Sequence, residues 1–126
     1  MIESFCAANA SEPAVAEFVS PLRAQADQWQ ALSRAITRDA AANADEAGAA
    51  AYDYLFYSGY VVLAYWWARS VAAANASDHS DSFKQSKLET ARFYFARILP
   101  RTLAHAAAIE SGASPLMAMD AERFSP

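Results

Sequence analysis

Residues 54–68 read YLFYSGYVVLAYWWA, without one charged side chain, between Asp53 and Arg69. At 100° per residue, this stretch predicts a helix that is apolar on two opposite sides. The side that we assign to the core carries Tyr52, Phe56, Gly59, Leu63, Trp66, Ser70 and Ala74. The side that we assign to an interface carries Tyr54, Tyr57, Val61, Ala64, Tyr65 and Ala68. Because a small three-helix bundle buries one side of each helix, we expect the second side to contact a partner chain or another domain; the alternative is that the two other helices enclose it.

The composition around this stretch predicts an all-α protein. Of the 126 residues, 55% are hydrophobic and only three are glycine, while about a quarter are alanine, the strongest helix former. A chain of this length forms one domain and can bury a core without metals or disulfides. The net charge of −4 and the pI near 5.0 argue against a nucleic-acid-binding protein, which carries a basic surplus.

Polar breaks divide the chain into three long helices, near residues 13–42, 46–75 and 82–111. Ser82 with Gln85 predicts a capping box at the start of the third helix, and Gly112 predicts its end. Apolar spacing of three and four predicts one buried seam on the first and third helices. The seams are Val15, Phe18, Leu22, Ala26, Trp29, Ser33, Ile36 and Ala40, and Leu88, Ala91, Phe95, Ile98, Thr102, Ala106 and Ile109. Because both seams keep their phase through Pro21 and Pro100, we expect kinks at these prolines and not helix ends.

The predicted fold is all-α: an antiparallel up-and-down bundle of three long helices, with a short N-terminal helical segment. We expect residues 1–11 to be an N-terminal segment or the tail of a preceding domain, residues 12–119 to be the bundle, and residues 120–126 to be a tail. The uncharged stretch of 15 residues is shorter than the ~20 that a spanning helix needs, so we expect no membrane span. One cysteine, Cys6, and the lack of a secretory signal favour a cytoplasmic setting.

Candidate catalytic and metal-binding residues are few. His79 lies in a polar loop, His105 has no carboxylate or histidine one turn away, and Cys6 has no histidine partner at a recognisable spacing. We therefore expect no metal site, no catalytic residue and no cofactor site in this chain. One polar stripe, within about 80° of arc on the third helix, includes Arg97, Arg101 and His105. It is either an anion contact, for example to a cofactor phosphate, or a solvated helix face.

The second and third helices resemble a known family. Asp53-Tyr54-Leu55, Gly59, Val61, Leu63 and Trp67-Ala68-Arg69 are similar to a pattern in the C-terminal extension of large bacterial acyl-CoA dehydrogenases. The same order continues through Lys87, Ala91-Arg92-Phe93-Tyr94-Phe95, Leu99-Pro100, Gly112, Leu116 and Met117. Over residues 45–119, this order resembles the 3-methylmercaptopropionyl-CoA dehydrogenase-like group. Ser58 departs from the pattern, where a large apolar residue is expected.

The resemblance implies a parent enzyme that holds FAD and oxidises the α,β bond of an acyl-CoA. In that family, a glutamate removes the α-proton, the flavin accepts the β-hydride, and an electron-transfer flavoprotein receives the electrons. These functions belong to the dehydrogenase body, so the resemblance implies that this chain is a non-catalytic packing domain whose partners are that body and further copies of itself.

Two other functions stay open at this point. The chain could be a free-standing helical adaptor that grips a partner helix in an aromatic groove. It could also bind the phosphates of CoA through Arg97 and Arg101.

Overall fold

The computed structural model describes residues 1–124 and confirms an all-α bundle. Residues 125 and 126, the end of the predicted tail 120–126, lie outside the described residues. The α-helices are α1 (Ile2–Ala8), α2 (Ala16–Ala42), α3 (Asp45–Asn75), α4 (Asp81–Phe93), α5 (Thr102–Glu110) and α6 (Ser114–Met117). A π-helical turn, η1 (Tyr94–Ile98), and a 3₁₀ turn, η2 (Leu99–Arg101), join α4 to α5, and a second 3₁₀ turn, η3 (Ala121–Phe124), follows α6.

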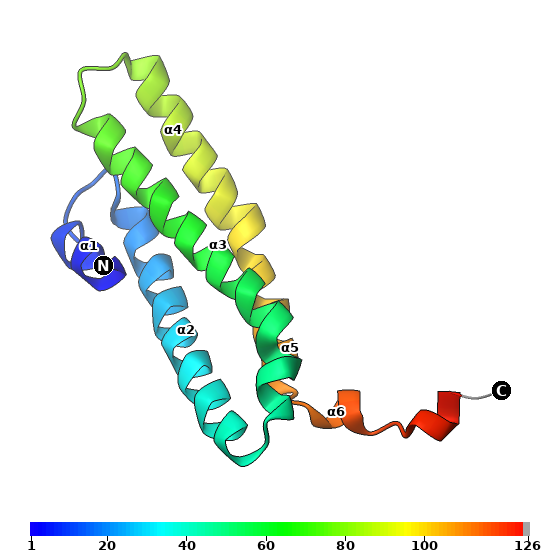
Figure 1. Ribbon diagram of the computed structural model, residues 1–126. Helices are drawn as coiled ribbons and strands as arrows, with labels where there is room; N and C mark the ends of the chain where they lie inside the picture. Colours follow the sequence, from blue (N-terminus) through cyan, green and yellow to red (C-terminus); the bar gives the residue numbers. More distant parts are fainter. Residues whose placement is uncertain (125–126) are drawn as a thin grey trace.

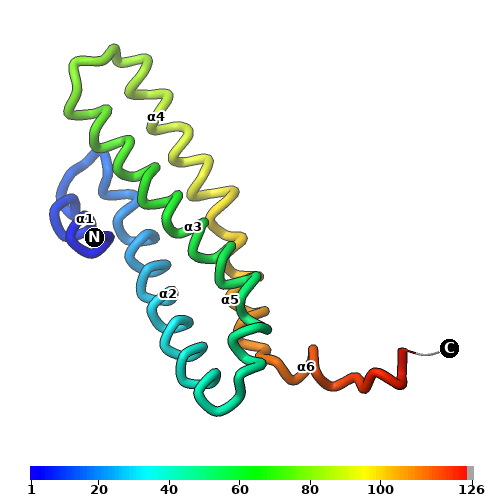
Figure 2. The backbone as a smooth tube through the Cα atoms, in the orientation of Figure 1, coloured from blue at the N-terminus to red at the C-terminus, as the bar shows by residue number. Residues whose placement is uncertain are grey.

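The long helices run antiparallel, as the sequence predicts. Figure 1 shows α3 lying between α2 and the run formed by α4 and α5, and Figure 2 traces the same up-and-down path. The first long helix, α2, continues through Pro21, which confirms that this proline does not end the helix. Since α3 contacts every other long helix, the side chains of α3 decide where the core lies.

The core consists of two clusters along the bundle. Near α1, it packs side chains of α2, α3 and α4 around Phe18 and Leu22. Toward the opposite end, it packs side chains of α2, α3 and α5 around Tyr57 and Val61. The predicted seams of the first and third helices supply many of the buried residues, including Val15, Phe18, Leu22, Ala26, Ala91, Thr102, Ala106 and Ile109.

The third long helix is a run of four segments and not one kinked helix. Pro100 has no N–H, and its ring would collide with the carbonyl of Ala96 in an α-helix. The π-turn before Pro100 takes more residues per turn than an α-helix, whereas the 3₁₀ turn that contains it takes fewer. Because these deviations offset each other, Thr102 and Ala106 still reach the core at the positions that an uninterrupted 3.6-residue period predicts.

Two helix ends illustrate how local chemistry sets the boundaries. The N-cap of α4 is Ser80, whose hydroxyl accepts a hydrogen bond from the backbone N–H of Phe83 at 3.3 Å. The predicted capping box at Ser82 is therefore wrong, because the N-cap lies two residues earlier and Ser82 is already inside α4. Gly112 follows α5 with a φ of +69°, as expected for a left-handed end. The carboxylate of Glu46 then accepts a hydrogen bond from the N–H of Ala113 at 2.9 Å, which fixes the start of α3 to the end of α5.

The short helix α1 packs against the bundle. Cys6 is fully buried, and its thiol lies 3.8 Å from the carbonyl oxygen of Val19. The ring of Phe5 meets the ring of Tyr65 edge to face, with centroids 5.6 Å apart. Burial raises the pKa of the Cys6 thiol, so this side chain behaves as a small buried hydrophobe, as predicted.

Candidate interaction surface

The two sides of α3 have the opposite roles to those that the sequence predicts. The side assigned to an interface is buried, and most of the side assigned to the core is exposed. Five of the six residues assigned to an interface, Tyr57, Val61, Ala64, Tyr65 and Ala68, are buried inside the chain. The sixth, Tyr54, is half-buried, and its hydroxyl lies 2.7 Å from the hydroxyl of Ser33 on α2. The assignment of these residues to an interface is therefore wrong, because α1, α2 and the run from α4 to α5 cover most of this side.

The side of α3 that faces inward carries small residues between its tyrosines. It carries Ala50, Ala64, Ala68, Val61 and Val71 among its tyrosines, and small residues let the neighbouring helices approach closely. The buried tyrosines satisfy their hydroxyl groups within the bundle. The hydroxyl of Tyr57 donates to the side-chain oxygen of Gln25 at 2.9 Å and lies 3.1 Å from that of Gln28. Hydrophobicity alone does not separate the two sides, because both are strongly apolar.

The opposite side of α3 is exposed, and it is strongly apolar. Tyr52 and Leu55 are 66% and 69% exposed, and the rest are between 38% and 50% exposed. We call this surface the outer face; its residues are Tyr52, Leu55, Phe56, Val62, Leu63 and Trp66. Near one end, the guanidinium group of Arg69 lies 4.8 Å from the centre of the Trp66 ring. An apolar surface of this extent on a single helix is typical of an interaction site.

One polar contact lies beside the outer face. Nδ1 of His105, on α5, lies 2.7 Å from Oδ1 of Asp53, on α3. The imidazole stacks on the ring of Phe56 with centroids 5.5 Å apart and an angle of 13° between the planes. Residue spacing along one helix does not indicate this pair, because Asp53 and His105 lie on different helices, 52 positions apart.

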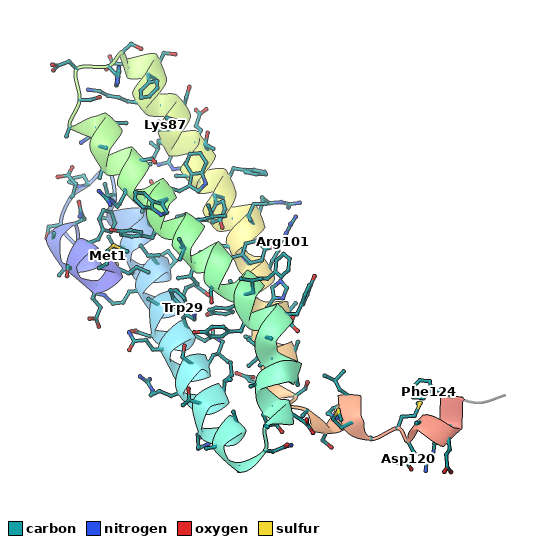
Figure 3. All side chains as sticks on the ribbon, in the orientation of Figure 1. Met1, Trp29, Lys87, Arg101, Asp120 and Phe124 are labelled. Carbon is teal, nitrogen blue, oxygen red and sulfur yellow. The ribbon has the colours of Figure 1, made fainter. Side chains whose placement is uncertain are left out.

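The predicted anion site is not assembled as expected. Arg97 and Arg101 are exposed, in η1 and η2, and Figure 3 shows Arg101 at the surface. His105 instead faces the carboxylate of Asp53, which would repel an anion bound to that imidazole. Anion binding by the two arginines alone stays a prediction. His79 is exposed in the loop before α4, with its ring beside that of Phe83.

The C-terminal arm, residues 114–124, is a second apolar surface. Leu116, Met117, Met119 and Phe124 are each more than half exposed. Figure 1 shows α6 and the turn after it extending away from the bundle, and Figure 3 places Asp120 and Phe124 on that extension. Exposed side chains of this kind on a protruding segment favour docking onto another surface.

Within residues 1–124, hollows of about 360–380 Å³ lie open on the surface, whereas the more enclosed ones are smaller. A cavity of about 170 Å³ lies between the ends of α2, α3 and α5, lined in part by Ile36, Asp39 and Glu46. Pockets for drug-sized ligands measure about 300–1,000 Å³. Within the described part of the chain, no three His, Cys, Asp or Glu side chains gather closely enough to hold a metal ion. Among residues 1–124, no helix combines the length and hydropathy that a membrane span needs.

Comparison with known families shows to which family the chain belongs. The sequence model of the family described as acetyl-CoA dehydrogenase C-terminal like matches residues 1–120. This chain belongs to that family. The match starts at residue 1 and so includes α1, which packs on the bundle. No curated protein matches the chain.

Proposed function

We propose that this chain is the C-terminal packing and oligomerisation domain of an FAD-dependent acyl-CoA dehydrogenase. The observation that carries the proposal is the pair of apolar surfaces, the outer face and the C-terminal arm, on a member of a dehydrogenase C-terminal family. A domain whose own fold leaves such surfaces uncovered fits a role in packing against other protein.

The parent enzyme in this proposal oxidises the α,β bond of an acyl-CoA. FAD would be bound by the dehydrogenase body and would accept the hydride, and an electron-transfer flavoprotein would receive the electrons. The chain described here would contribute no catalytic residue. The 3-methylmercaptopropionyl-CoA dehydrogenase-like group and a cytoplasmic location are the finer parts of the proposal, and the resemblance of residues 45–119 supports the first of them.

In this arrangement, the C-terminal arm is the contact with the dehydrogenase body. It projects from the end of the bundle where α3 begins and α5 ends. Glu46 and Gly112 fix the base of the arm to the bundle. The apolar side chains of Leu116, Met117 and Phe124 would then reach a groove on the body.

The test begins with the genomic reading frame around the codon for Met1. We expect it to encode a dehydrogenase body in the same frame or next to it. That body, produced with a tag, should co-purify with this chain, and the complex should carry the absorbance of oxidised flavin. Leu116→Glu with Met117→Glu should abolish co-purification, whereas Leu103→Glu, an exposed leucine on α5, should not. A frame without any dehydrogenase body would contradict the proposal and favour the free-standing adaptor.

A further inference from the structure

The outer face of α3 has the arrangement of side chains that pairing with a second copy requires. Its six residues lie at three, four and seven positions on either side of Gly59. Positions at equal distances from Gly59 carry similar apolar side chains: Leu55 and Leu63, Phe56 and Val62, and Tyr52 and Trp66. From this symmetry we infer that α3 pairs antiparallel with α3 of a second copy, around a two-fold axis at Gly59.

Helix geometry makes this pairing sterically favourable. When two copies of α3 cross antiparallel at Gly59, Tyr52 of one copy lies level with Trp66 of the other. At 100° per residue, those two side chains leave the helices about 20° on opposite sides of the centre line. The same holds for Leu55 and Leu63, about 40° from that line. The side chains therefore interdigitate, as ridges pack into grooves.

Gly59 itself supplies an independent observation. Glycine inside a helix costs about 1 kcal/mol relative to alanine. A Cβ atom at Gly59 would meet no atom of this chain within 4 Å, so no packing inside the chain requires glycine there. The residue is exposed, at the centre of the outer face. A helix that crosses at this point would come closest at Gly59, where a side chain would hold the two backbones apart.

Charge and area also favour a second copy. In a two-fold interface, a charged side chain near the axis lies close to the same charge on the other copy, which repels it. Residues 54–68 carry no charge, so this repulsion does not arise. The six side chains leave on the order of 450 Å² of apolar surface exposed per chain. Two copies would thus bury about 900 Å² of it, and the polar rim would bring the interface to the ~1,000 Å² that specific association needs. A dissociation constant of roughly micromolar order is expected.

This inference deepens the oligomerisation part of the proposed function, but it needs neither flavin nor a dehydrogenase body. Sedimentation equilibrium of the 126-residue chain over a wide concentration range should show a monomer–dimer transition. Gly59→Ala should raise the melting temperature of the monomer by about 2–5 °C and weaken dimerisation at least tenfold. Gly48→Ala is the matched control, because Gly48 lies about 16 Å along α3 from the axis and is equally open. It should raise the melting temperature and leave the dimer intact.

Cross-linking tests the antiparallel direction. The Tyr52→Cys chain should not cross-link to itself on oxidation, because the two positions lie about 21 Å apart in the dimer. Mixed with the Trp66→Cys chain, it should form a covalent heterodimer. A chain that stays monomeric at high concentration would overturn the inference, as would a dimer that Leu63→Glu leaves intact. Protection of the outer face only in complex with the dehydrogenase body would also overturn it, and would leave the proposed function standing.

Discussion

Nδ1 of His105 lies 2.7 Å from Oδ1 of Asp53, and this contact joins the last regular helix of the bundle to its central helix. Both side chains are more than three-quarters buried, and the stacked ring of Phe56 covers the imidazole. The pair therefore fixes the rotation of α5 about its own axis relative to the outer face.

We expect the His105–Asp53 pair to stabilise the bundle measurably. A hydrogen bond to a charged group contributes about 1.5–3 kcal/mol, so His105→Ala and Asp53→Ala should each lower the free energy of unfolding by about 1–3 kcal/mol. Urea unfolding of both single variants and the double variant gives the coupling energy of the pair. Strictly additive losses would show that the two side chains act independently.

Neighbouring valines on α3 should respond oppositely to the same substitution. Val61 is fully buried and Val62 is 38% exposed. Val61→Asp would place an unpaired carboxylate in the core, which costs several kcal/mol, so the variant should lose its helical circular dichroism at 25 °C. Val62→Asp should keep it. If Val61→Asp stayed folded and Val62→Asp did not, the sides of α3 would be reversed from those described here.

Alkaline pH should destabilise the bundle through its buried tyrosines. Burial raises the pKa of both Tyr57 and Tyr94 to about 12, whereas tyrosine in an unfolded chain titrates near 10. Between these values, the unfolded chain loses protons that the folded chain keeps. The free energy of unfolding contributed by these tyrosines is therefore fully present below pH 10 and falls as the pH rises toward 12.

Urea unfolding at several pH values between 9 and 12 would measure this slope. Tyr57→Phe combined with Tyr94→Phe should flatten it, at the loss of about 1 kcal/mol per hydrogen bond at lower pH. Tyr52→Phe is the control, because the ring of Tyr52 is exposed, and it should leave the slope unchanged. A double variant with the original slope would assign the alkaline loss of stability to other groups.

Two glycines should differ in their response to alanine. Gly112 has a φ of +69°, and an added Cβ would lie 3.1 Å from Oε2 of Glu46. Gly112→Ala should therefore lower the free energy of unfolding by about 1–2 kcal/mol. Gly48→Ala, in the open first turns of α3, should raise it by up to about 1 kcal/mol. Thermal unfolding of both variants compares them, and equal shifts would rule out strain at Gly112.

The sequence allowed the architecture to be predicted because periodicity and helix ends are local properties. The spacing of Val15, Phe18 and Leu22 places these residues on one face whatever the neighbouring helices do. The order of residues in the second and third helices indicated the family that the comparison confirms over residues 1–120.

The surface could not be predicted in the same way, because it depends on how helices pack. Both sides of α3 are apolar, and whether Val61 or Leu63 is the buried residue depends on how the neighbouring helices pack on α3. The Asp53–His105 pair was missed for a related reason. These residues are 52 positions apart, and only the packing of α5 on α3 brings them together.

The joint at Pro100 has a consequence for how this chain can change. Since the wide turn and the tight turn offset each other, replacing the proline with a helix-forming residue would keep His105 directed at Asp53. Deleting a single residue from α5 ahead of His105 would not, because everything after it would rotate by about 100°. Ahead of His105 the chain therefore tolerates new side chains far better than a new length, so homologous domains should differ here by substitution and rarely by insertion or deletion.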